Sequence, residues 1–392
     1  MNHLIMVPGK AILEKEITEA IYIYIENGKI NKIGPINEVP SRFQDVEKIE
    51  IQKENTIVPG FIDVHIHGAA GADTMDATSI ALTTIAKALP AEGTTSFLAT
   101  TITQKHENIE KALKNAADYC GEHNQPGKAE VLGVHLEGPF INVKRAGAQP
   151  KEYIINPDLK LFQRWQELAD GKIKLVTVAP ELDNGTDFIR YLHGNGVIAS
   201  IGHSDAIYEE METAVKAGAK QVTHLFNGMR GLHHREPGVA GSALLFKELM
   251  VELIADGIHV RPEVMKLVIN AKGTERMILI TDAMRAKCLK SGIYDLGGQD
   301  VSVADGKALL ADGTLAGSIL KMNDSIKNTI DSAQISLVEA VQMASVNPAK
   351  QLNVFDRKGS IAPGKDADLT ILTNDYQVDL TICRGEIAYT RG

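Results

Sequence analysis

The chain has 392 residues, enough to bury a large core, and its 44% hydrophobic and 23% charged residues are typical of a globular protein. A net charge of −9 argues against general nucleic-acid binding, which needs a basic face. The cysteines, Cys120, Cys288 and Cys383, lie far apart and indicate no disulfide framework, so we expect a cytoplasmic protein. No apolar run reaches about 18 residues and no signal-peptide pattern opens the chain, so we expect no membrane association.

Both ends of the chain are rich in predicted strands. Residues 21–33 form two alternating segments around Asn27-Gly28, which is a strong hairpin signal. Three more alternating segments lie near the C-terminus, at residues 367–372, 378–383 and 386–389. We therefore expect a small β-sandwich domain built from both termini, residues 1–57 and 353–392, beside a catalytic domain of residues 58–352.

The central part alternates between strand-like and helix-like segments. The strand-like runs occupy residues 62–67, 94–100, 131–137, 173–179, 197–203, 220–224, 250–256 and 277–282. Helix-like stretches lie between most of them, at residues 78–91, 105–120, 157–169, 206–217 and 262–271. Eight strands, each followed by a helix-sized crossover, predict an α/β fold of the (β/α)8 TIM-barrel type. A doubly wound open sheet is the alternative.

The first strand of the centre carries a His-x-His pair, His65 and His67. Side chains alternate along a strand, so both imidazoles point the same way, about 7 Å apart. Two such imidazoles can bind one metal ion, since imidazole suits zinc, iron and similar ions. Taken alone, the pair is equally compatible with a polar strand end.

Four further strand-like runs end in a residue that can bind a metal or move a proton: Glu137, His203, His224 and Asp282. In a (β/α)8 barrel the active site lies at the C-terminal ends of the strands, so these side chains would meet His65 and His67 at one mouth. Agreement among five strand ends favours a metal site over satisfied polar residues.

The predicted set of ligands favours a hydrolytic metal site. Three or four protein ligands with an open position are typical of catalytic ions, and a zinc finger is excluded because no cysteine belongs to the set. Such an ion lowers the pKa of bound water, and Asp282 is then placed to accept a proton and return it to the leaving group. The alternative for Asp282 is a helix N-cap before Ala283-Met284.

Several longer motifs carry a family resemblance. They occur in this order: Pro-Gly-Phe-Ile-Asp-Val-His-Ile-His-Gly, His-Leu-Glu-Gly-Pro-Phe, Gly-His-Ser, Thr-His-Leu-Phe-Asn, His-His-Arg-Glu-Pro-Gly, Ala-Asp-Gly-Ile-His and Thr-Asp-Ala-Met. From about residue 57 to the C-terminal Gly-Lys-Asp-Ala-Asp-Leu segment, the chain resembles the N-acetylglucosamine-6-phosphate deacetylases of the amidohydrolase superfamily. The first motif is shared by many amidohydrolases, whereas the second and fifth together are specific to the deacetylases.

The resemblance implies removal of acetate from N-acetylglucosamine 6-phosphate, in amino-sugar catabolism. It makes Glu137, His203 and His224 ligands of a main divalent ion and Asp282 the proton-transfer residue. Some relatives lack the His-x-His pair and work with one ion. This chain keeps His65 and His67, so we expect two ions bridged by Glu137. The residue types do not separate zinc, iron, cobalt and manganese.

The resemblance also implies the substrate contacts. The residues assigned to the phosphosugar are Ala148, Gln149, Asn227, Gly228, Arg235, Asp256, His259, Leu315, Ala316 and Gly317. In the family the loop that carries Arg235 reaches into the neighbouring subunit, which implies a homodimer. Backbone N–H groups and a guanidinium suit a phosphate dianion. Nothing in these residues separates glucosamine from its galactosamine epimer.

The chain departs from the family pattern at Gln149. Several relatives have a histidine there that helps to polarise the acetyl carbonyl. A glutamine can donate a hydrogen bond but not a proton, so the second ion would take over the polarisation. Histidines on segments expected at the surface need no function: His3, His106, His123 and His193.

Other functions are less compatible with the sequence. Cyclic-amide hydrolases of the dihydroorotase or hydantoinase kind usually carry a bridging carboxylated lysine, whereas the corresponding strand here ends in Glu137. A serine hydrolase built on Ser204 fails the nucleophile-elbow pattern, since Ala206 stands where glycine is required. A non-catalytic sugar-phosphate sensor would be expected to have lost Asp282 or a ligand. Nucleotide cofactors are unsupported, because no phosphate-binding glycine motif follows a strand.

Overall fold

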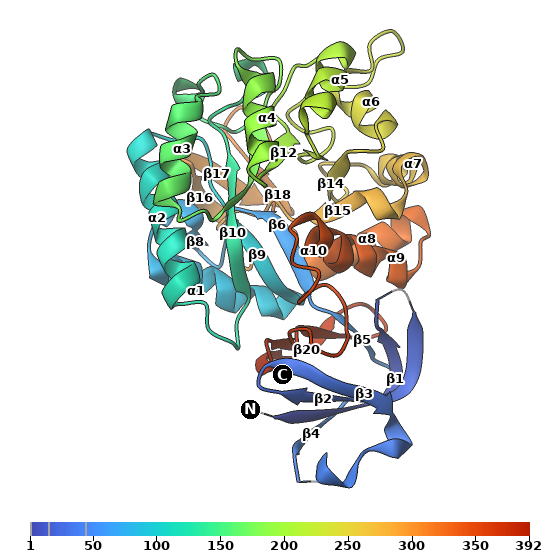
Figure 1. The fold of residues 1–392 in the computed structure, drawn as a ribbon. Coiled ribbons are helices and arrows are strands. Elements are labelled where there is room, and N and C mark those ends of the chain that lie inside the picture. Colours follow the sequence, from blue (N-terminus) through green and yellow to red (C-terminus); the bar gives the residue numbers. More distant parts are fainter. Residues whose placement is uncertain (1, 15, 44) are drawn as a thin grey trace.

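A computed structural model describes residues 2–14, 16–43 and 45–392 of the chain (Figure 1). Its larger part is a parallel eight-stranded sheet in chain order: β6 (Phe61–Ile66), β9 (Thr94–Thr100), β10 (Glu130–Glu137), β11 (Ile173–Val178), β12 (Ile198–Ile201), β13 (Gln221–Val222), β14 (Met250–Ile254) and β15 (Met277–Ile280). A parallel bridge between Ile66 and Ala283 brings its two edges together. The predicted TIM-like barrel is therefore confirmed.

Helices surround this sheet (Figure 1). They are α1 (Ser79–Ala88), α2 (His106–Glu122), α3 (Leu159–Leu168), α4 (Gly185–Gly194), α5 (Tyr208–Ala217), α6 (Gly238–Leu245), α7 (Pro262–Lys272), α8 (Met322–Ala333), α9 (Leu337–Val341) and α10 (Asn347–Gln351), with a π-helical turn at Gln342–Val346 between the last two. The main apolar core joins strand residues such as Phe97 and Val176 to helix residues such as Leu113 and Phe188. No helix in the described ranges is long and apolar enough to cross a membrane.

The shorter elements connect these parts. Single 3-10 turns occur at Ile36–Glu38, Ser41–Phe43, Thr74–Asp76, Leu89–Glu92, Val143–Arg145, Lys151–Tyr153 and Thr274–Arg276. A two-stranded ribbon, β7 (Gly68–Ala69) with β8 (Ala72–Asp73), follows the first barrel strand. A three-stranded antiparallel sheet follows the last one: β16 (Gly292–Leu296), β17 (Gln299–Ala304) and β18 (Lys307–Leu309). This small sheet is not among the predicted elements.

Strands from both termini form a separate mixed sheet in the lower part of Figure 1. Its members are β1 (His3–Ile12), β2 (Ile17–Glu26), β3 (Lys29–Pro35), β4 (Glu47–Glu50), β5 (Thr56–Pro59), β19 (Leu369–Leu372), β20 (Val378–Cys383) and β21 (Glu386–Thr390). The predicted union of the two termini is confirmed, with all eight strands in one hydrogen-bonded sheet. The predicted hairpin turns at Asn27-Gly28, where both φ angles are positive (51° and 78°). The domain boundaries at 57/58 and 352/353 stay a prediction.

One prediction about this sheet is wrong. His3 was expected at the surface, but its side chain is only 3% exposed in β1 and its Nδ1 lies 3.2 Å from a Glu47 carboxylate oxygen. Strand β4 pairs in parallel with β1 and covers the His3 side chain. The residues around His3 do not predict this pairing, because β4 lies more than 40 residues away in the sequence.

Candidate active site

The six predicted catalytic and metal-binding side chains converge at the C-terminal ends of the barrel strands. They lie in or within two residues after β6, β10, β12, β13 and β15, and each is at most 8% exposed: His65, His67, Glu137, His203, His224 and Asp282. Buried Asp63 in β6 helps to align two of these segments. Its carboxylate accepts hydrogen bonds from the His65 amide at 3.2 Å and the Thr281 hydroxyl at 2.5 Å.

Three of the six leave the strand geometry at the residue itself. His203, His224 and Asp282 have φ angles of 47°, 30° and 48°, in the left-handed region that non-glycine residues seldom adopt. Because these residues turn away from the strand direction, the strands end two residues earlier than periodicity predicts. Unfavourable backbone angles at several converging residues are typical of a functional site.

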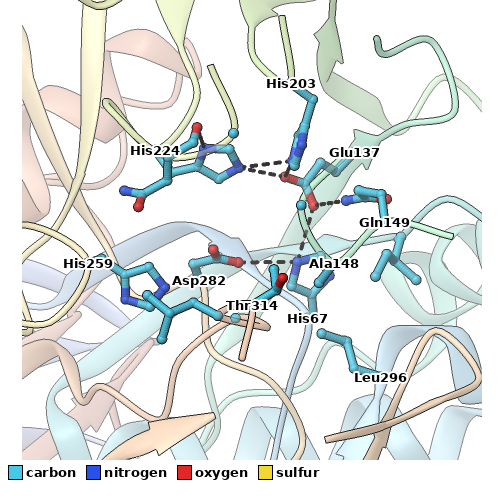
Figure 2. A pocket seen from close by; sticks show the side chains of 16 residues that line it. His67, Glu137, Ala148, Gln149, His203, His224, His259, Asp282, Leu296 and Thr314 are labelled. Carbon is cyan, nitrogen blue, oxygen red and sulfur yellow. Dashed lines mark hydrogen bonds and ion pairs between the residues drawn. The ribbon is translucent and has the colours of Figure 1, made fainter. Parts of the chain in front are cut away.

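One cluster is formed by Glu137, His203 and His224. The Glu137 Oε1 atom lies 3.2 Å from His203 Nε2 and 3.0 Å from His224 Nε2, and the two Nε2 atoms lie 3.2 Å apart (Figure 2). The other ring nitrogens are bonded to backbone carbonyls, His203 Nδ1 to Arg145 O at 2.8 Å and His224 Nδ1 to Asn227 O at 3.1 Å.

These contacts fit a cation. A carbonyl can only accept, so both neutral rings carry their proton on Nδ1 and turn the Nε2 lone pair inwards. Two lone pairs and a carboxylate oxygen would then face one another at about 3 Å with no proton between them. A divalent ion removes this conflict, and two imidazoles with a carboxylate are a common ligand set for one.

The second cluster is formed by His65, His67 and Asp282, on the other side of Glu137. Asp282 Oδ1 lies 3.4 Å from His65 Nε2 and 3.3 Å from His67 Nε2. Glu137 reaches the same rings, with Oε1 at 3.4 Å from His65 Nε2 and Oε2 at 3.3 Å from His67 Nε2. The buried nitrogens His65 Nε2 and His67 Nδ1 have no hydrogen-bond partner among the described residues. Each cluster has ligand atoms that lie within 4.8 Å of one another, so each can hold a metal ion.

Charge interactions dominate this buried centre. Burial lowers the pKa of His67, but the Asp282 and Glu137 carboxylates outweigh that effect and raise the pKa to about 9. Burial raises the pKa of Glu137, but the charge of His65 and the close polar contacts of His203 and His224 hold it well below its usual value. The centre therefore favours negative carboxylates with positive charge beside them, which is the environment that a bound cation needs.

Except for fully buried His65, the residues of the two clusters line a cavity of about 210 Å³ (Figure 2). Most predicted substrate residues line it: Ala148, Gln149, Asn227, Gly228, His259, Leu315 and Gly317. Three others do not. Asp256 lies behind His259 and accepts a hydrogen bond from its Nδ1–H at 2.7 Å. Ala316 is buried between two residues that line the cavity. Arg235 lies on an exposed loop with its Nη1 at 2.7 Å from His234 Nε2, outside the cavity of this single chain.

Gln149 is fixed in one orientation. Its Oε1 accepts the Thr103 amide proton at 2.8 Å, so its Nε2 faces inwards and donates to Glu137 Oε2 at 2.8 Å (Figure 2). The residue that departs from the family pattern therefore contacts the carboxylate between the two clusters.

The structure adds residues that the sequence motifs missed. Ile102 and Leu296 give the cavity an apolar wall, and Thr314 lies beside Leu315. Glu252 lies behind His65 in β14, with its Oε2 at 3.0 Å from His65 Nδ1. The sequence does contain a sign of this residue, because Glu252 stands alone in the apolar run Met-Val-Glu-Leu-Ile. A glutamate is rarely buried unless its charge is paired.

Ser204, the candidate nucleophile of the serine-hydrolase alternative, uses its hydroxyl for local hydrogen bonds in a turn. Its hydroxyl donates to Glu181 Oε2 at 2.7 Å and accepts the Ala206 amide proton at 3.1 Å. A carboxylate partner in a turn gives no nucleophile–imidazole pair of the kind that serine hydrolases use.

Comparison with known proteins decides the family. The model of the amidohydrolase family matches residues 56–388. The chain belongs to the amidohydrolase family. It is 51% identical over 379 residues to the N-acetylglucosamine-6-phosphate deacetylase of Bacillus subtilis, covering 96% of this chain and 95% of that protein. It therefore also belongs to the deacetylase group that its motifs predicted.

Two further relatives mark out this group. The N-acetylgalactosamine-6-phosphate deacetylase of Escherichia coli O157:H7 is 37% identical over 332 residues, 85% of this chain and 87% of that protein. A mutant N-acetyl-D-glucosamine-6-phosphate deacetylase from Mycobacterium smegmatis, solved in complex with N-acetyl-D-glucosamine-6-phosphate, superposes with a TM-score of 0.91 at 30% identity. That match covers 99% of this chain and all of the mycobacterial one.

Proposed function

We propose that the cavity hydrolyses the acetamide of N-acetyl-D-glucosamine 6-phosphate to D-glucosamine 6-phosphate and acetate. The observation that carries the proposal is the convergence of Glu137, four histidines and Asp282 at one cavity in a deacetylase-family chain, where all but the fully buried His65 line the cavity. Amide hydrolysis needs an activated water, a polarised carbonyl and a proton donor for the leaving nitrogen. This cluster has residues for all three.

Glu137, His203 and His224 would hold one divalent ion, and His65 with His67 a second, with Glu137 between them. The unpaired buried nitrogens and the facing Nε2 atoms support this assignment. When bound, such ions lower the pKa of water and polarise a carbonyl. Zinc, iron or a similar ion suits imidazole and carboxylate ligands.

Asp282 would move the proton. Its carboxylate lies at the cavity floor, where it can take a proton from the attacking water and return it to the amino nitrogen that leaves the acetyl carbon. Gln149 would hold Glu137 in place, and the apolar Ile102 and Leu296 would limit the space for the acyl methyl group.

The phosphosugar would be held by the cavity walls: Ala148, Asn227, Gly228, His259, Leu315 and Gly317, with Asp256 and Ala316 behind them. Arg235 would complete the phosphate site from the partner subunit of a homodimer, since its loop is exposed and outside the cavity of its own chain. A net charge of −9 repels a phosphorylated substrate, so cations must converge locally. The cytoplasm is the proposed compartment.

Acetate release from a substrate panel tests the proposal. The panel contains N-acetylglucosamine and N-acetylgalactosamine, each with and without the 6-phosphate, and an Asp282→Asn preparation controls for contaminating activity. We expect acetate mainly from N-acetylglucosamine 6-phosphate. Preference for the galactosamine epimer would instead indicate the activity for which the Escherichia coli relative is named. Equal rates with and without phosphate would contradict the proposed substrate class.

A further inference from the structure

Glu252 is a fully buried carboxylate behind the metal ligands, outside the cavity and absent from the motif-based set of site residues. One oxygen, Oε2, lies 3.0 Å from His65 Nδ1 and accepts the His224 amide proton at 3.0 Å. The other, Oε1, accepts the Gln221 side-chain amide proton at 2.6 Å. Glu252 therefore contacts a ligand from each of the two clusters.

The contact with His65 fixes that ring. A carboxylate accepts a hydrogen bond from Nδ1–H, so the His65 ring keeps its proton on Nδ1 and its lone pair on Nε2, which faces Glu137 and Asp282 at 3.4 Å. The corresponding partners of His203 and His224 are neutral backbone carbonyls. His67 Nδ1 has no partner among the described residues. Within the described chain, His65 is thus the one ligand ring of the four with a charged partner on its outer nitrogen.

The carboxylate adds charge as well as orientation. Glu137 and Asp282 place two negative charges in the centre, and Glu252 adds a third directly behind the second cluster. A carboxylate behind an imidazole makes that ring a stronger electron donor to a metal ion. An extra negative charge in a buried site also makes binding of a further cation more favourable.

We propose that Glu252 is a positioning residue that sets the affinity of the second ion, held by His65 and His67, by fixing the tautomer of His65 and strengthening it as a donor. This inference rests on the proposed two-ion site and deepens it, because it names the buried group that distinguishes the two positions. Glu252 does not line the cavity, and the ligand side chain that it contacts is His65, whereas its contact with His224 is to the backbone amide.

The first test is zinc binding to the E252Q variant, with chelator competition used to obtain both affinities. Glutamine has nearly the same shape and keeps one oxygen that can accept from His65 and the His224 amide, so the substitution removes the charge and the acceptor for the Gln221 side chain. We expect two zinc equivalents in the wild type. In E252Q we expect one of them to bind about 10- to 100-fold more weakly while the other changes little.

Two control variants separate an effect of the Glu252 charge on zinc binding from a general loss of stability. His65→Ala should weaken the same equivalent directly. Glu130→Gln makes the same chemical change at the opposite end of the barrel, where Glu130 pairs with Lys358 and Arg357, and should leave both zinc affinities unchanged even if it lowers stability. Two unchanged affinities in E252Q would overturn the role of Glu252 while leaving the two-ion site intact. A single equivalent already in the wild type would overturn both proposals.

A second measurement needs no variant and keeps the inference testable if E252Q does not fold. In the zinc-loaded wild type with 15N-labelled histidine, we expect the His65 proton on Nδ1, slow to exchange and shifted downfield by the carboxylate. A proton on Nε2 of His65 would overturn the proposal.

Discussion

At the scale of single residues, several functional groups of the centre are oriented by a second contact. Backbone carbonyls fix His203 and His224, Glu252 fixes His65, and Thr103 fixes Gln149. The residue types at the strand ends could be read from the sequence, since a carboxylate or imidazole ending an apolar run is a local pattern. Their orienting partners could not, because Arg145 O and Glu252 reach the centre only through the fold.

Asp282→Asn should reduce turnover by several orders of magnitude, because a carboxamide cannot accept the proton of the attacking water. Substrate should still bind, so KM should change much less than kcat. Steady-state kinetics with acetate detection, together with metal analysis, measures both effects. Turnover close to that of the wild type would place the base elsewhere, with buried His135 as the next candidate.

Gln149 offers a second test at this scale. Gln149→Leu removes the donor to Glu137 and leaves the Thr103 amide unpaired. A hydrogen bond to a charged group contributes about 1.5–3 kcal/mol, so kcat/KM should fall about ten- to a hundredfold. Gln149→His restores a donor and should recover most of that loss. If both variants behave alike, the donor to Glu137 has no part in the reaction.

At the scale of elements, sequence periodicity predicted the barrel strands well but ended three of them too late. The residues at which the chain turns, His203, His224 and Asp282, continue the apolar alternation while their φ angles are already left-handed. The small sheet β16–β18 was missed, although its residue Leu296 lines the cavity. Local alternation does not say where a short strand will pack, so that contribution to the site was not predictable.

Glu130 gives an element-scale prediction at the start of β10. Its Oε1 lies 2.9 Å from Arg357 Nη2 and its Oε2 lies 2.7 Å from Lys358 Nζ. Both cations belong to the segment that leads from α10 to the terminal sheet. Burial raises the pKa of Glu130, but Lys358 and Arg357 outweigh that effect and lower it to about 2. Glu130→Gln takes one carboxylate partner from buried Lys358 and from half-buried Arg357, so the free energy of unfolding should fall by about 3 kcal/mol.

The loss of unfolding free energy in Glu130→Gln should become smaller as the pH falls. The folded-state pKa of Glu130 lies below the usual value of 4.5, so its stabilising effect is complete above about pH 4.5 and is lost as the pH falls towards 2. Urea unfolding of wild type and Glu130→Gln over this range should show the difference between them shrinking as the pH falls. A difference that stays constant would show that the Glu130 charge does not stabilise the fold.

At the scale of the whole molecule, the proposed homodimer is testable through Arg235. Arg235→Ala should raise KM for the 6-phosphate sugar about ten- to a hundredfold and hardly change it for unphosphorylated N-acetylglucosamine. If subunits exchange, mixing Arg235→Ala with Asp282→Asn protein should restore activity, since a mixed dimer with shared sites contains one complete pocket. Activity no greater than the sum of the two parts would rule out the shared pocket.

The central claim is that the five ligands hold divalent ions without which this chain cannot release acetate. The most direct measurement follows acetate release from N-acetylglucosamine 6-phosphate while zinc is titrated into chelator-stripped protein. We expect almost no turnover without metal and recovery on addition of zinc, with maximal turnover at two equivalents per chain. In His65→Ala, turnover should stop rising at one zinc equivalent per chain or fewer. Full turnover in the stripped protein would contradict the claim, and a maximum at one equivalent in both proteins would remove the second ion from it.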